Sequence, residues 1–174
     1  EVRKRLSLPT RAPLLYKEAF SLLKESVTIL PHGLVPMLDE HIQHFRTEGS
    51  RSWSGLSLPI DGHIFVVYND SHTDNRISAT MMEEFFHLWL GHTPTKLRAY
   101  CPDGKHRSYK KDIETEAYAS GAASLLPYSS LSDMLCESGT ISTISEHYGV
   151  SQELVLYRAK VTKLYRKHRS LLVS

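Results

Sequence analysis

RISATMMEEFFHLWLGH, residues 76–92, is the stretch around which the rest of the chain must fold. Apolar side chains occur nearly all round the helix that it predicts: Met81, Met82, Phe85, Phe86, Leu88, Trp89 and Leu90. A helix of that kind is normally buried. Glu83, Glu84 and His87 nevertheless lie in its middle, and acidic side chains are rarely buried unless they are paired or bind a metal. We therefore expect a buried helix that carries a polar site.

The spacing of these three residues is that of a metal site. Residues four apart on a helix lie on the same face, so Glu83 and His87 project together and Glu84 lies about 100° round. This is the layout of H-E-x-x-H, in which two metal ligands flank a glutamate that acts as general base. Here Glu83 stands where the motif has its first His.

A third candidate ligand lies on a helix predicted over about 111–126. A catalytic zinc site needs three protein ligands, and Glu114 is the first candidate, with Glu116 as its competitor. Both could instead be ordinary first-turn glutamates that the helix dipole favours. Small residues on this helix allow another backbone to approach closely: Ala117, Ala119, Gly121, Ala122 and Ala123.

Two other arrangements of the same residue types point to different sites. Glu40, His41 and His44 cluster on one predicted helix, where a solvated helix face is the favoured interpretation. Glu84 and His87 also form one E-x-x-H, half of a ferritin-like di-iron site. Because no second E-x-x-H occurs in the sequence, the all-helical bundle that such a site needs is disfavoured.

Length and composition are those of an ordinary globular domain. The 174 residues are 41% hydrophobic and 23% charged, and a net charge of +2 implies no strong nucleic-acid or membrane field. No run approaches the ~18 apolar residues of a membrane span. Cys101 and Cys136 lack metal-site spacing, which favours reduced thiols in a cytoplasmic protein. The chain begins at Glu1 rather than Met, so we expect a piece of a longer protein.

Periodicity and turn residues predict the remaining elements. Helices are expected over about 13–27 and 36–45, with a turn at LPHGLV between them. Strands are expected at 52–58 and 63–68, and a short hairpin within 95–110. Further helices are expected at about 111–126, 130–137, 140–147 and 152–168.

The segment 141–161 resembles a helix-turn-helix, with Gly149 at the turn and Ser151 at the next N-cap. Basic residues follow on the last helix: Arg158, Lys160, Lys163, Arg166, Lys167 and Arg169. One such unit on a nearly neutral chain is weak support for DNA binding. A solvated basic face is favoured, on a helix whose other side packs against the core.

The order of these motifs resembles the ImmA/IrrE family of metallopeptidases. The matching residues are Arg76, Thr80, Glu83, Glu84, His87, Gly91 and His92, then Glu114, Ala117, Leu125, Leu126 and Pro127, then Gly149, Val150 and Ser151. The resemblance covers about 50–161. It implies a zincin-like α+β fold, in which a small, mainly antiparallel sheet packs on an active-site helix and a helical C-terminal part follows.

The resemblance also implies an activity and a site. The activity is cleavage of a protein substrate such as a helix-turn-helix repressor, under stress or in mobile-element control. Glu83, His87 and Glu114 would be the metal ligands and Glu84 the general base. One domain would span 1–174, with helices at 1–50, a metallopeptidase-like core at 51–127 and C-terminal helices at 128–174.

Glu83 in place of His changes the expected metal chemistry. A Glu-His-Glu set adds a negative charge, which raises the pKa of a zinc-bound water above the ~7 of better-known zinc hydrolases. Oxygen-rich sites also suit Mn²⁺ or Fe²⁺, so these are alternatives to the expected Zn²⁺. The competing function is a peptide- or partner-binding module without catalysis. Arg107, Tyr109 and His92 are candidate oxyanion donors by composition.

Overall fold

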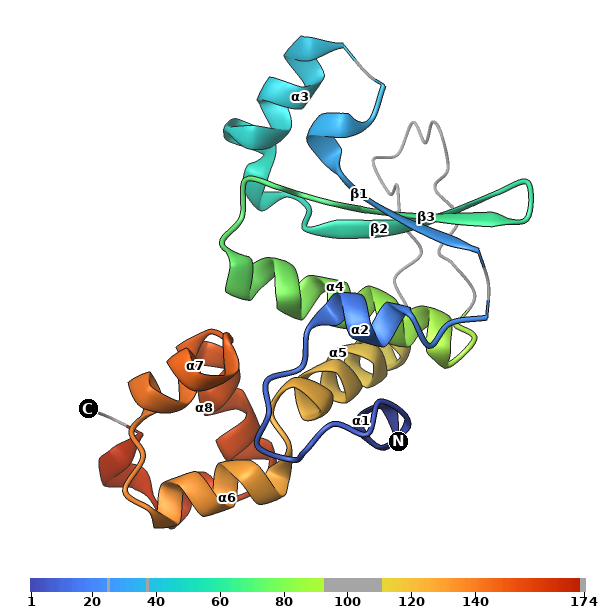
Figure 1. The fold of residues 1–174 in the computed structure, drawn as a ribbon. Helices are drawn as coiled ribbons and strands as arrows, with labels where there is room; N and C mark the ends of the chain where they lie inside the picture. The colour runs from blue at the N-terminus through green and yellow to red at the C-terminus, as the bar shows by residue number, and fades with distance from the viewer. Residues whose placement is uncertain (25, 37, 93–110, 173–174) are drawn as a thin grey trace.

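The computed structural model describes residues 1–24, 26–36, 38–92 and 111–172 of the chain. Among these residues, a three-stranded sheet lies over two long helices, and further helices follow at the C-terminal end (Figure 1). The predicted α+β class, with a small sheet and a helical C-terminal part, is confirmed.

The sheet is mixed. β2 (Gly55–Ile60) and β3 (His63–Tyr68) form the predicted antiparallel hairpin, and β1 (Val27–Pro31) pairs with β3 in parallel, giving the order β1-β3-β2 in the described part of the chain. The expected small sheet is therefore present, and the parallel pairing of β1 is the feature that the sequence did not predict. A parallel pair needs a partner far away in the sequence, so the five residues VTILP carry no local pairing signal of the kind a hairpin has.

β1 also corrects the prediction that 1–50 holds only helices and turns. The helix expected over 13–27 is reduced to α2 (Tyr16–Phe20), and the turn expected at LPHGLV becomes the end of β1 followed by a 3₁₀ turn, His32–Leu34. α1 (Val2–Arg5) and α3 (Asp39–Arg46) complete the helices of this part, and a second 3₁₀ turn spans Glu48–Arg51.

The later helices lie close to their predicted positions. They are α4 (Asp74–Trp89), α5 (Lys111–Leu125), α6 (Tyr128–Cys136), α7 (Ile141–Tyr148) and α8 (Gln152–Val161), followed by 3₁₀ turns at Leu164–Arg166 and Arg169–Leu171. The helix expected to reach about residue 168 stops at Val161, because Lys163 takes a left-handed conformation at φ 65°. The hairpin expected within 95–110 lies outside the described residues.

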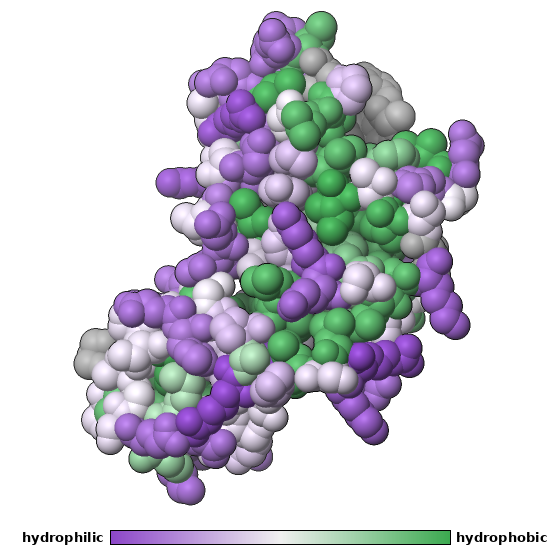
Figure 2. Space-filling model, viewed as in Figure 1, coloured by the Kyte–Doolittle hydropathy of each residue, from purple (hydrophilic) through white to green (hydrophobic). Residues whose placement is uncertain are grey.

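The core forms around α4. Met81, Met82 and Phe85 are fully buried, and the ring of Phe85 meets that of Phe20 from α2 edge-on, with 5.6 Å between centroids. The C-terminal end of the helix reaches solvent instead, where Leu90 is 41% exposed. Hydrophobic residues gather over the centre of the face in Figure 2, where α2 and β1 lie, and hydrophilic residues prevail over the C-terminal helices.

Small side chains bring α5 against α4. Ala117 and Ala122 are buried, and a Cβ added to Gly121 would lie 3.1 Å from the carbonyl carbon of Met82 and 3.2 Å from its oxygen. Backbone atoms cannot rotate away as a side chain can, so a residue larger than glycine would have to push the two helices apart by a few tenths of an ångström. The packing fixes the separation of the two helices that carry the candidate ligands.

No helix in the described ranges combines the length and apolar character that a membrane crossing requires.

We predict that Gly121→Val lowers the free energy of unfolding by about 1–3 kcal/mol, because the added methyl groups force α5 away from the α4 backbone. Urea denaturation followed by circular dichroism measures the change. Ser120→Ala, at the neighbouring, partly exposed position, is the matched control and should change stability much less. A Val variant as stable as the wild type would contradict the close approach.

Candidate metal centre

Glu83 and His87 of α4 meet Glu114 of α5 at the junction of the two helices. Each offers one ligand atom, and these atoms all lie within 4.8 Å of one another. The three side chains are partly buried. Within the described part of the chain, no other group of three His, Cys, Asp or Glu side chains has this geometry. The cluster of Glu40, His41 and His44 on α3 is exposed instead, as favoured from the sequence.

The separation of the His87 and Glu114 ligand atoms suits a divalent ion. His87 Nε2 lies 3.5 Å from Glu114 Oε2, and the two side chains are 16% and 15% exposed. Ligand atoms at about 2.0–2.2 Å from a tetrahedral ion lie roughly 3.3–3.6 Å from each other. The donor set of one imidazole and two carboxylates is one that Zn²⁺, Mn²⁺ and Fe²⁺ all accept. The residues present therefore fit the ion that the sequence led us to expect.

Glu84, the expected base, projects from α4 toward the sheet. The residue is buried, and its Oε2 accepts a hydrogen bond of 2.6 Å from Ser57 Oγ on β2. β2 comes close because Gly55 leaves room for the side chain of Thr80. Sequence reasoning missed Ser57, although it is a polar residue between Leu56 and Leu58 in a predicted strand, which could have marked it as facing a polar group.

His92 lies beside the cluster. Its Nδ1 is 3.1 Å from Nδ1 of His87, and its Nε2 is 3.2 Å from Oε2 of Glu116. Glu116, the competitor for the third ligand position, thus contacts His92 and lies outside the cluster that Glu114 completes. Arg107 and Tyr109, the other candidate oxyanion donors, lie outside the described residues.

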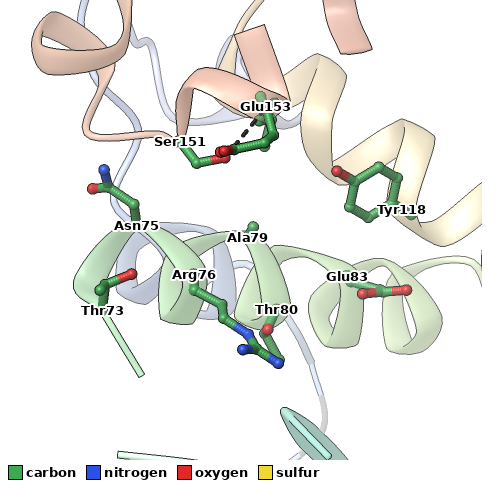
Figure 3. Close-up of a pocket in the computed structure, with 10 residues that line it drawn as sticks. Thr73, Asn75, Arg76, Ala79, Thr80, Glu83, Tyr118, Ser151 and Glu153 are labelled. Carbon is green, nitrogen blue, oxygen red and sulfur yellow. Dashed lines mark hydrogen bonds between the residues drawn. The ribbon is translucent and has the colours of Figure 1, made fainter. Parts of the chain in front are cut away.

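A pocket of about 390 Å³ opens next to Glu83 (Figure 3). Tyr118 of α5 forms one end, Ala79 and Thr80 of α4 lie along it, and Ser151 at the start of α8 lies across from α4. Burial raises the pKa of the Tyr118 hydroxyl above its usual range, and the charges of Tyr157 and Glu83 add to the rise. The hydroxyl therefore stays protonated and able to donate at neutral pH.

The helix-turn-helix-like pair α7–α8 contacts α4, the helix that carries Glu83 and His87. Gly149 takes φ 60° at the turn and Ser151 Oγ accepts a bond of 3.2 Å from the backbone N–H of Leu154, as the sequence predicted. Asn75 of α4 then donates to the carbonyl of Val150, which is fully buried. The turn is therefore part of the core.

Arg158 corrects the predicted basic face. We expected it to be solvated, but it is only 8% exposed, and its Nε donates to the carbonyl of Leu126 at 3.1 Å. The guanidinium stays buried because it donates a hydrogen bond to this carbonyl, which lies just beyond the end of α5 and has no partner within that helix. Lys160 and Arg166 stay exposed.

Comparison with known families gives a match that includes α4, α5 and the candidate cluster. The model of Peptidase_M78, described as the IrrE N-terminal-like domain, matches residues 36–160, well over half of the chain. The chain belongs to the M78 peptidase family. The resemblance to ImmA/IrrE metallopeptidases is thereby confirmed, and with it the zincin-like fold. No curated protein and no solved structure gave a significant match. The scaffold is that of a metallopeptidase, and the matched residues include the candidate cluster.

We predict that the purified protein binds one divalent ion per chain and that His87→Ala lowers the affinity at least tenfold, because it removes one of three ligands. Equilibrium dialysis against Zn²⁺ with elemental analysis measures both. His41→Ala, which removes an exposed imidazole on α3, is the matched control and should bind as the wild type does. Equal binding by the His87 and His41 variants would argue against this centre.

Proposed function

We propose that this M78 family member is a metal-dependent endopeptidase that cleaves a protein substrate. The observation that supports it is the meeting of Glu83, His87 and Glu114 on a peptidase scaffold, with a buried Glu84 next to Glu83 on the same helix. Zn²⁺ is the proposed ion, with Mn²⁺ or Fe²⁺ as alternatives because two of the three ligands are carboxylates.

The proposed mechanism divides the work among the residues of the site. A bound ion supplies Lewis acidity, which lowers the pKa of a water and polarises the scissile carbonyl. Glu83, His87 and Glu114 would hold this ion. Glu84 takes the proton from the attacking water and delivers it to the leaving amine. Ser57 orients the Glu84 carboxylate through its hydrogen bond of 2.6 Å.

Tyr118 is our candidate for stabilising the oxyanion that forms on the attacked carbonyl. It lines the pocket together with Glu83, and in Figure 3 its hydroxyl points into that pocket. A tyrosine hydroxyl is protonated at neutral pH, and burial raises the pKa of this one further. A hydrogen-bond donor placed where charge develops lowers the barrier by several kcal/mol in other hydrolases, on the order of 3 kcal/mol per donor.

We propose that a protein substrate binds along β2. β2 is an edge strand of the described sheet, and Ser57 and Glu84 join it to the active-site helix. An extended peptide can pair with such an edge and extend the sheet. A helix-turn-helix repressor is the substrate that the family resemblance suggests, and a cytoplasmic location remains a prediction from the cysteines.

The alternative is a binding module without catalysis, which Glu83 in place of His favours because it weakens the activation of water. DNA binding through α7–α8 is not favoured. The start of α8, which would enter a major groove in a DNA-binding helix-turn-helix, lies across the pocket from α4 and carries Glu153 (Figure 3).

We predict that Glu84→Gln lowers the rate of peptide cleavage about 10²–10⁴-fold while the protein keeps its metal, because the amide retains the shape but cannot take a proton. Cleavage of a defined peptide library is followed by mass spectrometry and metal content by elemental analysis. Glu40→Gln, an exposed change on α3, should cleave at the wild-type rate. Undiminished cleavage by the Glu84 variant would exclude it as the base. A metal-loaded wild type that cuts nothing would favour the binding module.

A further inference from the structure

We propose that His92 and Glu116 are positioning residues that hold His87 ready to bind the metal. They form a chain of hydrogen bonds that starts at the Glu116 carboxylate, passes through the His92 imidazole and ends on the ring of His87. The inference rests on the metal centre of the proposed function and adds two residues to it that lie outside the ligand cluster.

When both imidazoles are neutral, the donors and acceptors of this chain fit together in one direction. A carboxylate can only accept, so the bond of 3.2 Å to Glu116 Oε2 places the proton of a neutral His92 on Nε2. Its Nδ1 is then an acceptor, and at 3.1 Å it receives the Nδ1–H of His87. The remaining ring nitrogen of His87, Nε2, carries a lone pair and faces Glu114 Oε2 at 3.5 Å. A lone pair and a carboxylate that face each other are the arrangement that a cation between them stabilises.

The end of α4 puts His92 in place. The N–H of Gly91 donates to the carbonyl of Leu88, and the N–H of His92 donates to the carbonyl of His87 at 2.9 Å. These two bonds form a Schellman motif, which requires a left-handed residue, and Gly91 supplies it at φ 67°. The motif folds the chain back over the last turn, so the His92 ring meets that of His87 edge-on with 5.1 Å between centroids.

The two residues that support His87 differ in how far they are buried. The His92 side chain is only 10% exposed, whereas that of Glu116 is 61% exposed. The hydrogen bond between the two imidazoles is therefore shielded from water. Water competes for the hydrogen bond between His92 and the exposed Glu116 carboxylate. We expect His92 to contribute most of the effect on His87 and Glu116 to contribute less.

Such partners fix the tautomer and orientation of a ligating imidazole, and their loss typically weakens metal binding 10–100-fold. The tautomer with the proton on Nδ1 of His87 leaves Nε2 unprotonated toward Glu114. Without His92, the His87 ring loses the hydrogen bond that favours this tautomer, and binding of the ion must then offset the cost of restoring it. His92 thus acts through His87 and not on the ion.

The test measures Zn²⁺ affinity by competition with a chromophoric chelator. We expect His92→Phe, which keeps a ring but no hydrogen bonds, to weaken binding about 10–100-fold. Glu116→Gln should weaken it less, and Gly91→Ala should reproduce part of the His92 effect by straining the Schellman motif. Asp112→Asn, an exposed acidic position on the same helix as Glu116, is the matched control and should bind as the wild type does.

A spectroscopic signature separates positioning from mere packing. Long-range ¹H–¹⁵N correlation spectra of the wild type should show His87 protonated on Nδ1 and His92 on Nε2, and His92→Phe should lose the single His87 tautomer without loss of fold. Wild-type Zn²⁺ affinity in His92→Phe, or the opposite tautomers in the wild type, would overturn the inference and leave the proposed function standing. A wild-type protein that binds no metal would contradict both this inference and the proposed function.

Discussion

The close packing of α5 on α4 at Gly121 is the contact on which the candidate centre depends. Glu83 and His87 come from one helix and Glu114 from the other, so the distance between the helices sets the distance between the ligands. Met82 and Phe85 anchor α4 in the core, and Ala117 and Gly121 let α5 approach it. Since helices deform little, the ligands are held in place before any ion arrives. Two carboxylates this close repel each other, and a divalent cation relieves that repulsion.

The presence of Glu83 makes the centre more acidic than a His-His-Glu site. Two ligand carboxylates offset both charges of a divalent ion, so the ion attracts electrons from its water less strongly. Hydrogen bonds that orient the candidate ligands and the candidate base then contribute a larger share of catalysis than in a His-His-Glu site. Ser57 bonds to Glu84 from the sheet, and His92 bonds to His87 from the end of the helix. The chain thus combines an altered candidate ligand set with neighbouring residues that form hydrogen bonds to the candidate ligand His87 and the candidate base Glu84.

The sequence predicted the features that local rules determine. Glu83 and His87 share a face because four residues make about one turn, and Gly149 and Ser151 end and begin helices through backbone conformations that each residue favours. Features that depend on distant partners were missed. β1 pairs with a strand far along the chain, and Arg158 is buried because a carbonyl at the end of α5 receives it. The choice between Glu114 and Glu116 also needed the structure, because both lie near the start of one helix.

X-ray absorption at the zinc edge of the Zn²⁺-loaded protein tests the central claim most directly. A centre built from Glu83, His87 and Glu114 predicts a nitrogen and oxygen shell at about 2.0–2.1 Å, with the multiple scattering of a single imidazole and no sulfur. The His92 ring should not appear as a second ligand. Two or more imidazoles, or a Zn–S distance of about 2.3 Å, would place the ion elsewhere in the protein and contradict the account.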